Sequence, residues 1–180
     1  MTTPPLLLDT CVVLSLFATR RVEEILAANP GPFLIAEAVL RESMYIHVIV
    51  DGVREKEPVS FEPMFAAGTL AVVEPESEEE IQSLIDLSLQ LDDGEAMTCA
   101  LALHRGYRIA TDEKKAIRFV GNQIPIVGAL DLVRAWADAV AAPPILIREV
   151  LAAIEERGYV PGSDHRHYGW WCHTLGRGNV

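Results

Sequence analysis

The sequence predicts an α/β fold in which helices flank a mostly parallel sheet. Short apolar segments alternate with longer amphipathic segments along the chain, which is typical of strands joined by crossover helices. With 180 residues, half of them hydrophobic, the chain is long enough to bury a core. We see no internal repeat and no linker, so we assign residues 1–160 to one domain and residues 161–180 to an irregular tail.

The strands are predicted where short apolar runs are bounded by Pro, Gly or polar residues. The first run, "LLL", follows a proline and ends at Asp9, and the fourth, "YRIAT", ends just before Asp112. Both runs are short enough for strands and too short for buried helices. The predicted strands are residues 6–8, 32–36, 68–75, 107–111 and 124–128.

The helices are predicted from amphipathic patterns and from start and stop signals. Thr10 can cap the first helix, and Pro30 and Gly31 end it. Ser77 with Glu80 three residues later has the spacing of a capping box. Residues 52–63 are polar, contain two prolines and are predicted to be a loop. The predicted helices are residues 12–31, 37–49, 77–91, 92–106, 112–121, 129–142 and 145–158.

Composition excludes several classes of protein. No apolar run is long enough to cross a bilayer, and no basic segment precedes an apolar one at the N-terminus, so we expect neither a membrane protein nor a secretory signal. The three cysteines are widely spaced and odd in number, which favours a reducing cytoplasm over a disulfide framework. The net charge of −11 makes the chain a poor general binder of nucleic acid.

Four carboxylates stand where the fold would bring them together. Asp9 and Asp112 each end a predicted strand, so they would share one rim of a parallel sheet. Glu42 lies on an otherwise apolar face of the predicted helix 37–49. Glu95 lies in the first turn of the predicted helix 92–106. Such charges repel one another unless a cation neutralises them. With no nearby Cys or His ligand, the oxygen set suits Mg²⁺ or Mn²⁺, which can activate water for attack on a phosphodiester.

These residues resemble the PIN domain family, metal-dependent ribonucleases that include toxins of the VapC type. The likeness covers roughly residues 5–130. "LLLDTCVV" is similar to the family's opening strand, and "IAEAVLRE" is similar to its second motif, which ends at Glu42. The most specific part is "LDDGEAMTCALALHRGYRIATDEKKAIRFV", in which a Gly-Glu-Ala helix would supply the third acid and a Thr-Asp pair the fourth.

The resemblance implies a three-layer α/β/α sandwich that cleaves single-stranded RNA with Mg²⁺ or Mn²⁺. It also suggests a homodimer and, for a toxin of a toxin–antitoxin pair, an antitoxin protein as partner. Asp9, Glu42, Glu95 and Asp112 would be the metal ligands, with Asp93 as a rival for the third position. Candidates for supporting contacts around these ligands are Thr10, Asp93, Thr111 and Glu113.

A basic stretch brackets Asp112 and could hold phosphates beside the metal. An ordinary solvated helix face is the alternative for these residues. They are Arg105, Arg108, Lys114, Lys115 and Arg118. The tail carries His165, His167, Cys172 and His173, whose spacing matches no familiar zinc pattern.

Two other functions remain open from the sequence. A non-catalytic module could keep the same sandwich and use its acidic surface to bind protein partners. A phosphatase with an aspartate nucleophile would need a second Asp two residues after the first, where this chain has Cys11. The metal-dependent ribonuclease is therefore the leading hypothesis, and the binding module is its alternative.

Overall fold

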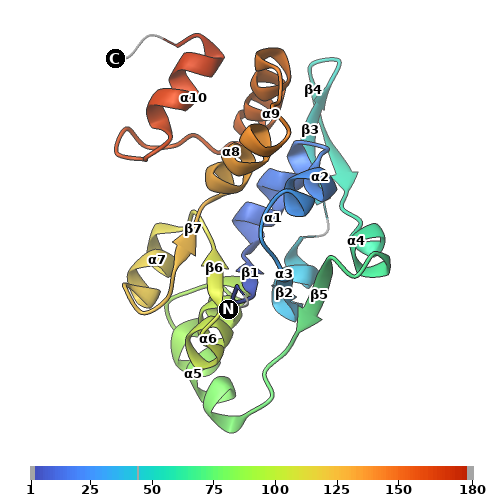
Figure 1. Ribbon diagram of the computed structural model, residues 1–180. Helices are drawn as coiled ribbons and strands as arrows, with labels where there is room; N and C mark the ends of the chain where they lie inside the picture. The colour runs from blue at the N-terminus through green and yellow to red at the C-terminus, as the bar shows by residue number, and fades with distance from the viewer. Residues whose placement is uncertain (1–2, 44, 178–180) are drawn as a thin grey trace.

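The computed structural model describes residues 3–43 and 45–177 and contains a five-stranded parallel sheet (Figure 1). Its strands lie in the order β5-β2-β1-β6-β7, and every neighbouring pair is parallel. Their bounds are β1 Leu6–Leu8, β2 Phe33–Ala36, β5 Leu70–Val73, β6 Arg108–Ala110 and β7 Ile126–Val127. The predicted α/β fold with a parallel central sheet is therefore confirmed.

Helices cover both faces of this sheet and complete three layers (Figure 1). One face carries α1 Thr10–Ala18, α2 Val22–Ala27, α8 Ala129–Ala139 and α9 Pro144–Glu156. The other carries α5 Glu78–Ser88, α6 Asp93–Arg105 and α7 Lys114–Val120. The short helices α3 Glu37–Glu42 and α4 Glu62–Ala66 lie near β2 and β5. Because β1 and β6 are wholly apolar or nearly so and are covered on both sides, they form the centre of the core.

The strand order creates a topological switch point between β1 and β6. The chain moves from β1 outward to β2 and β5, then returns to the opposite side of β1 and continues through β6 to β7. Ligand sites of open α/β sheets form in the crevice at such a point, outside the carboxyl ends of the strands. The residues after β1 and β6 are Asp9 and Thr111, so the fold itself points to this rim.

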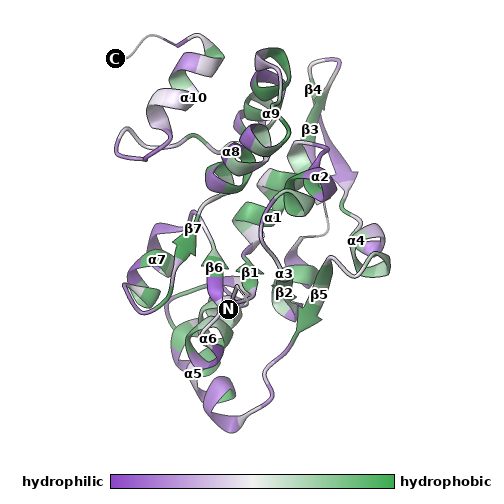
Figure 2. Ribbon diagram, viewed as in Figure 1, coloured by the Kyte–Doolittle hydropathy of each residue, from purple (hydrophilic) through white to green (hydrophobic). Residues whose placement is uncertain are grey.

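The predicted helix over residues 37–49 is wrong in its second half. Helix α3 ends at Glu42, and a β-hairpin follows, with β3 Tyr45–Val50 paired antiparallel to β4 Val53–Pro58. Asp51 and Gly52 both have positive φ, 51° and 79°, as a two-residue hairpin turn requires. The aromatic and β-branched residues of β3 favour a strand over a helix. Figure 2 shows most of β4 as hydrophilic, in contrast to the central strands, which agrees with its exposure to solvent.

Four further predictions of local structure need correction. Residues 52–63, predicted as a loop, contain β4 and the start of α4. The first helix divides into α1 and α2, because Arg20 adopts a left-handed φ of 57° and Thr19 donates a hydrogen bond to the carbonyl of Leu16. The cap of α1 is Asp9, not Thr10. The tail is not wholly irregular, because α10 Tyr168–Leu175 forms within it and packs on α9.

Candidate functional site: a carboxylate rim at the switch point

The carboxylate rim is the edge of the sheet at the carboxyl ends of β1 and β6, where Asp9, Glu42, Glu95 and Asp112 are found. Asp9 is its most buried acid. It is 1 % exposed and directly follows β1, where its backbone N–H bonds the carbonyl of Ala110 across to β6 at 3.0 Å. Its carboxylate accepts hydrogen bonds from the Thr10 N–H (2.8 Å), the Thr111 hydroxyl (2.7 Å) and the Cys11 thiol (3.4 Å). These donors hold both oxygens in place at the crevice between the two strands.

The pKa of Asp9 is raised to about 6, because burial, with a smaller contribution from the charge of Asp92, outweighs the three hydrogen bonds that lower it. Burial also keeps the Cys11 thiol protonated by raising its pKa, so Cys11 can act as a donor to Asp9. An ionised carboxylate is costly at this depth unless an opposite charge compensates for it. Asp9 therefore favours binding of a proton or of a cation.

Glu95 is the second buried carboxylate of the rim. It lies in the first turn of α6, where the Asp92 side chain caps the helix by accepting a hydrogen bond from the Glu95 N–H at 2.9 Å. Glu95 is 9 % exposed, and within residues 3–43 and 45–177 no donor contacts its carboxylate. Burial raises the pKa of Glu95 to about 7, with added repulsion from Asp92, Asp9 and Glu113. The charge of Asp9 is thus one of the causes of the shift at Glu95.

Glu42 borders the same rim although the helix used to predict its direction ends at this residue. Its carboxylate accepts hydrogen bonds from the Thr10 hydroxyl (2.7 Å) and from the backbone N–H of Gly94 (2.8 Å). It thus joins α3 to the first residue of α1 and to the start of α6. The adjacent Arg41 pairs with Glu37 at 3.4 Å.

Gly94 is required by this close approach of α3 and α6. A Cβ atom at this position would overlap the Glu42 carboxylate and lie 2.9 Å from the Thr10 hydroxyl oxygen. We expect Gly94→Ala to displace Glu42 from both hydrogen bonds and to lower the free energy of unfolding by about 1–3 kcal/mol. Urea unfolding measures this change.

The control for this prediction is the same substitution in a Glu42→Ala background, where the overlap is gone. There we expect Gly94→Ala to cost nothing or to stabilise slightly, because Ala forms helices more readily than Gly. An equal cost in both backgrounds would contradict the contact as the reason.

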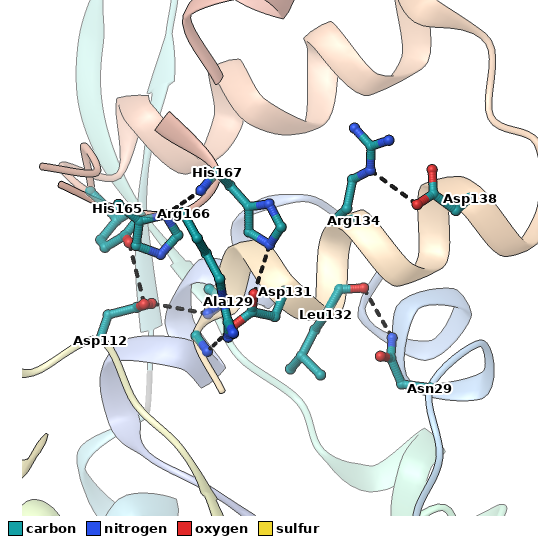
Figure 3. Close-up of polar contacts among 12 residues, drawn as sticks. Asn29, Asp112, Ala129, Asp131, Leu132, Arg134, Asp138, His165, Arg166 and His167 are labelled. Atoms are coloured by element: carbon teal, nitrogen blue, oxygen red, sulfur yellow. Dashed lines mark hydrogen bonds and ion pairs between the residues drawn. The ribbon is translucent and has the colours of Figure 1, made fainter. Parts of the chain in front are cut away.

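Asp112 lies just after β6, at the same edge of the sheet, but its side chain points toward the start of α8. One carboxylate oxygen accepts a hydrogen bond from the Ala129 N–H at 3.1 Å, at the start of α8, and the other from the Tyr159 hydroxyl at 3.2 Å. Burial raises the pKa of Asp112, while these bonds and nearby His165 lower it. Figure 3 shows the Asp112 side chain directed at Ala129.

Asp131, on α8, connects the tail to this region. Asp131 bonds the Gly128 N–H and pairs with Arg166 and with His167, whose Nε2 lies 2.7 Å from the carboxylate (Figure 3). These contacts keep the pKa of Asp131 below its usual value in spite of burial. Arg166 and His167 thus dock this part of the tail on α8.

The remaining predicted neighbours are divided between the rim and the surface. Thr10 and Thr111 donate to the rim carboxylates Glu42 and Asp9, as expected for supporting residues. Glu113 directly precedes α7, and its charge is one of the causes of the raised pKa of Glu95. Asp93 is exposed beside Glu95 in the same helical turn.

The basic stretch separates into two groups. Arg105 binds Glu80 (2.7 Å) and the carbonyl of Glu74, and Arg108 binds the carbonyls of Pro4 and Pro30 at the opposite end of the strands. Both are engaged in contacts that hold the fold together. The other group is exposed on α7, which starts at the rim: Lys114, Lys115 and Arg118.

Sequence reasoning missed Asp92 and Tyr159. Asp92 caps α6 and its charge reaches both Asp9 and Glu95; the spacing of Asp92 to Glu95, typical of a capping box, could have indicated it. Tyr159 had no signal in the sequence, because its contact with Asp112 spans 47 residues.

The fit of a divalent cation can be judged from these donors. Within the described residues, no group of three or more His, Cys, Asp or Glu side chains is close enough to hold a metal ion. Asp9 and Glu95 nevertheless offer hard oxygen ligands, and their pKa values are raised mainly by burial and also by repulsion from neighbouring acids. These two residues fit Mg²⁺ or Mn²⁺, whereas Asp112 would have to leave Tyr159 and Ala129 to join them.

Fold and rim together define a parallel α/β protein with a pair of buried carboxylates at its switch point. No protein-family model matches the chain, and no curated protein is significantly similar to it. In the described residues no helix is both long and apolar enough to cross a membrane.

Proposed function

We propose that this protein is a metal-dependent endoribonuclease that cleaves single-stranded RNA. The observation that carries the proposal is the pair Asp9 and Glu95, two buried acids with pKa values raised to about 6 and 7 at the switch point of a parallel sheet. A site that concentrates negative charge without compensation suits a divalent cation and, through it, a phosphodiester.

The residues of the rim would have two roles, as metal ligands and as supporting residues that orient the ligands. Asp9 and Glu95 would hold Mg²⁺ or Mn²⁺, which supplies charge neutralisation and an activated water when bound. Thr10, Thr111 and Cys11 fix the geometry around Asp9 and Glu42, in the manner of supporting hydrogen bonds at metal sites. Glu42 and Asp112 border this pair and could complete the ligand set.

The choice of RNA as substrate rests on the resemblance to PIN domain ribonucleases. A toxin of a toxin–antitoxin pair, a homodimer and a cytoplasmic location belong to the same proposal. If the acids prove not to bind a cation, the chain is better regarded as a non-catalytic module that binds protein partners through its acidic surface.

Calorimetric titration of Mn²⁺ into the purified protein tests the proposal. We expect binding by the wild type, and an affinity at least about 10-fold lower for Glu95→Gln, because a buried ligand charge is lost. Asp93→Asn is the matched control, since Asp93 lies in the same helical turn but is exposed. Its affinity is expected to be unchanged, which also decides between Glu95 and Asp93 as ligand.

Cleavage of a labelled single-stranded RNA in Mn²⁺ completes the test. Absence of Mn²⁺ binding by the wild type would refute the metal site and the ribonuclease together. Binding without cleavage would refute the ribonuclease alone.

A further inference from the structure

A groove next to the carboxylate rim has the opposite charge. It has a volume of about 470 Å³, lies between α7 and the segment that joins α5 to α6, and is lined by Gln90, Lys115, Arg118 and Phe119. This volume is within the range of small-molecule sites. In a chain of net charge −11, a groove lined by two basic residues and no acid needs an explanation.

Lys115 and Arg118 form no ion pair with any residue the structure describes. Both side chains are exposed on α7. The charges of Lys115 and Arg118 are therefore available to an anionic ligand.

The two other lining residues suit a nucleobase. Phe119 is half-buried, with one part packed on the core and another part lining the groove, so its ring can stack on a base. Gln90 is exposed, and its amide offers both donors and an acceptor to the edge of a base. Basic groups for phosphate, an aromatic ring and an amide are together the chemistry that recognises a nucleotide.

The groove lies next to the rim on two sides: one wall is the segment before α6, with Gln90, and the other is α7, with Lys115. Gln90 precedes Asp92 by two residues, and Lys115 follows Glu113 by two, so each wall reaches the rim within about 7 Å of chain. The charges of Asp92 and Glu113 both act on Glu95. A ligand in the groove therefore lies next to the proposed cation site.

We infer that this groove binds one nucleotide unit of a single-stranded RNA, next to the phosphodiester that the rim would cleave. Lys115 and Arg118 contact the two phosphates that flank this unit, and Phe119 stacks on its base. This inference rests on the proposed function for the identity of the strand. It also explains how an acidic protein holds a polyanion, because the attraction is confined to one side of the site.

The test measures binding of fluorescein-labelled oligouridine by fluorescence anisotropy in EDTA, so that no cation contributes. We expect the double variant Lys115→Gln, Arg118→Gln to bind at least about 10-fold more weakly. For this variant, the slope of log affinity against log salt concentration should also be smaller in magnitude by about 1.4, because two phosphate contacts on a single strand are lost. The double variant Arg54→Gln, Lys56→Gln, which removes the same charge from exposed β4, should bind like the wild type.

Phe119→Leu provides a second, independent measurement. It keeps an apolar side chain against the core but removes the stacking ring, and we expect binding about 5-fold weaker or more. A thermal unfolding midpoint similar to that of the wild type verifies that the variant is folded.

The possible outcomes separate this inference from the proposed function. Equal binding by the wild type and the Lys115, Arg118 variant would overturn the groove, even if Mn²⁺-dependent cleavage is observed. Loss of binding in that variant supports the groove, even if the wild type cleaves nothing. Displacement of the RNA by a poly-glutamate peptide at equal concentration would overturn the nucleotide as ligand in favour of an acidic protein.

Discussion

Asp9→Asn is expected to reduce Mn²⁺-dependent RNA cleavage by at least about 100-fold while leaving the fold intact. Asp9 is the most buried acid of the rim, so the loss of its charge would remove the most deeply placed of the proposed ligands. Removal of one preorganised electrostatic group at a reaction centre typically costs a factor of this size.

The fold is expected to survive because Asn also caps helices well. Its side-chain oxygen can still accept the Thr10 N–H that Asp9 accepts now. Circular dichroism and thermal unfolding check the fold, and a quantitative cleavage assay checks the activity. Asp86→Asn, at an exposed position on α5, is the control and should retain full activity. Activity of Asp9→Asn like that of the wild type would exclude Asp9 from the reaction.

The metal-free protein is expected to be more stable at pH 5 than at pH 8. The pKa of Asp9 rises from 3.8 to about 6 on folding, and that of Glu95 rises from 4.5 to about 7. Between those values the folded state binds more protons than the unfolded state, so stability falls as the pH rises. About three pKa units of these shifts lie above pH 5, which corresponds to about 3–4 kcal/mol of unfolding free energy.

Urea unfolding in EDTA at the two pH values measures this difference. The double variant Asp9→Asn, Glu95→Gln should lose most of it, because neither replacement side chain titrates. Glu80 provides an internal contrast: its bond to Arg105 lowers its pKa to about 2, so its contribution stays constant over this range. Equal stability of the wild type at pH 5 and pH 8 would contradict the statement that folding raises the pKa values of Asp9 and Glu95.

Added Mn²⁺ should restore stability at pH 8 in the wild type. A ligand that binds only the folded state at 100 times its dissociation constant contributes about 2.7 kcal/mol. No such gain is expected for the double variant. This comparison links the pH dependence to the cation site without reference to catalysis.

The rim was partly predictable because strand ends can be read from the sequence. Apolar runs ending in Asp9 and Asp112 predicted the positions of both acids, and β1 and β6 are parallel neighbours as that prediction required. Glu42 was assigned to the rim through a helix that ends at the residue itself, since residues 45–50 form β3. A short apolar segment fits both a helical and a strand pattern, and the Asp51-Gly52 turn was the signal that should have decided it.

The sequence by itself determined the alternation of strands and helices, the parallel sheet and the acids at its rim. Each of these depends on local hydrophobic patterning and on residues next to a strand end. Only the tertiary structure decided how the acids are held. Asp112 turns to Tyr159 from 47 residues away, Glu42 bonds the start of α6, and Arg105 pairs with Glu80, whereas Lys115 and Arg118 pair with no acid among the described residues. These contacts join segments distant in the chain, and burial sets the charge state of each acid only once those segments have packed.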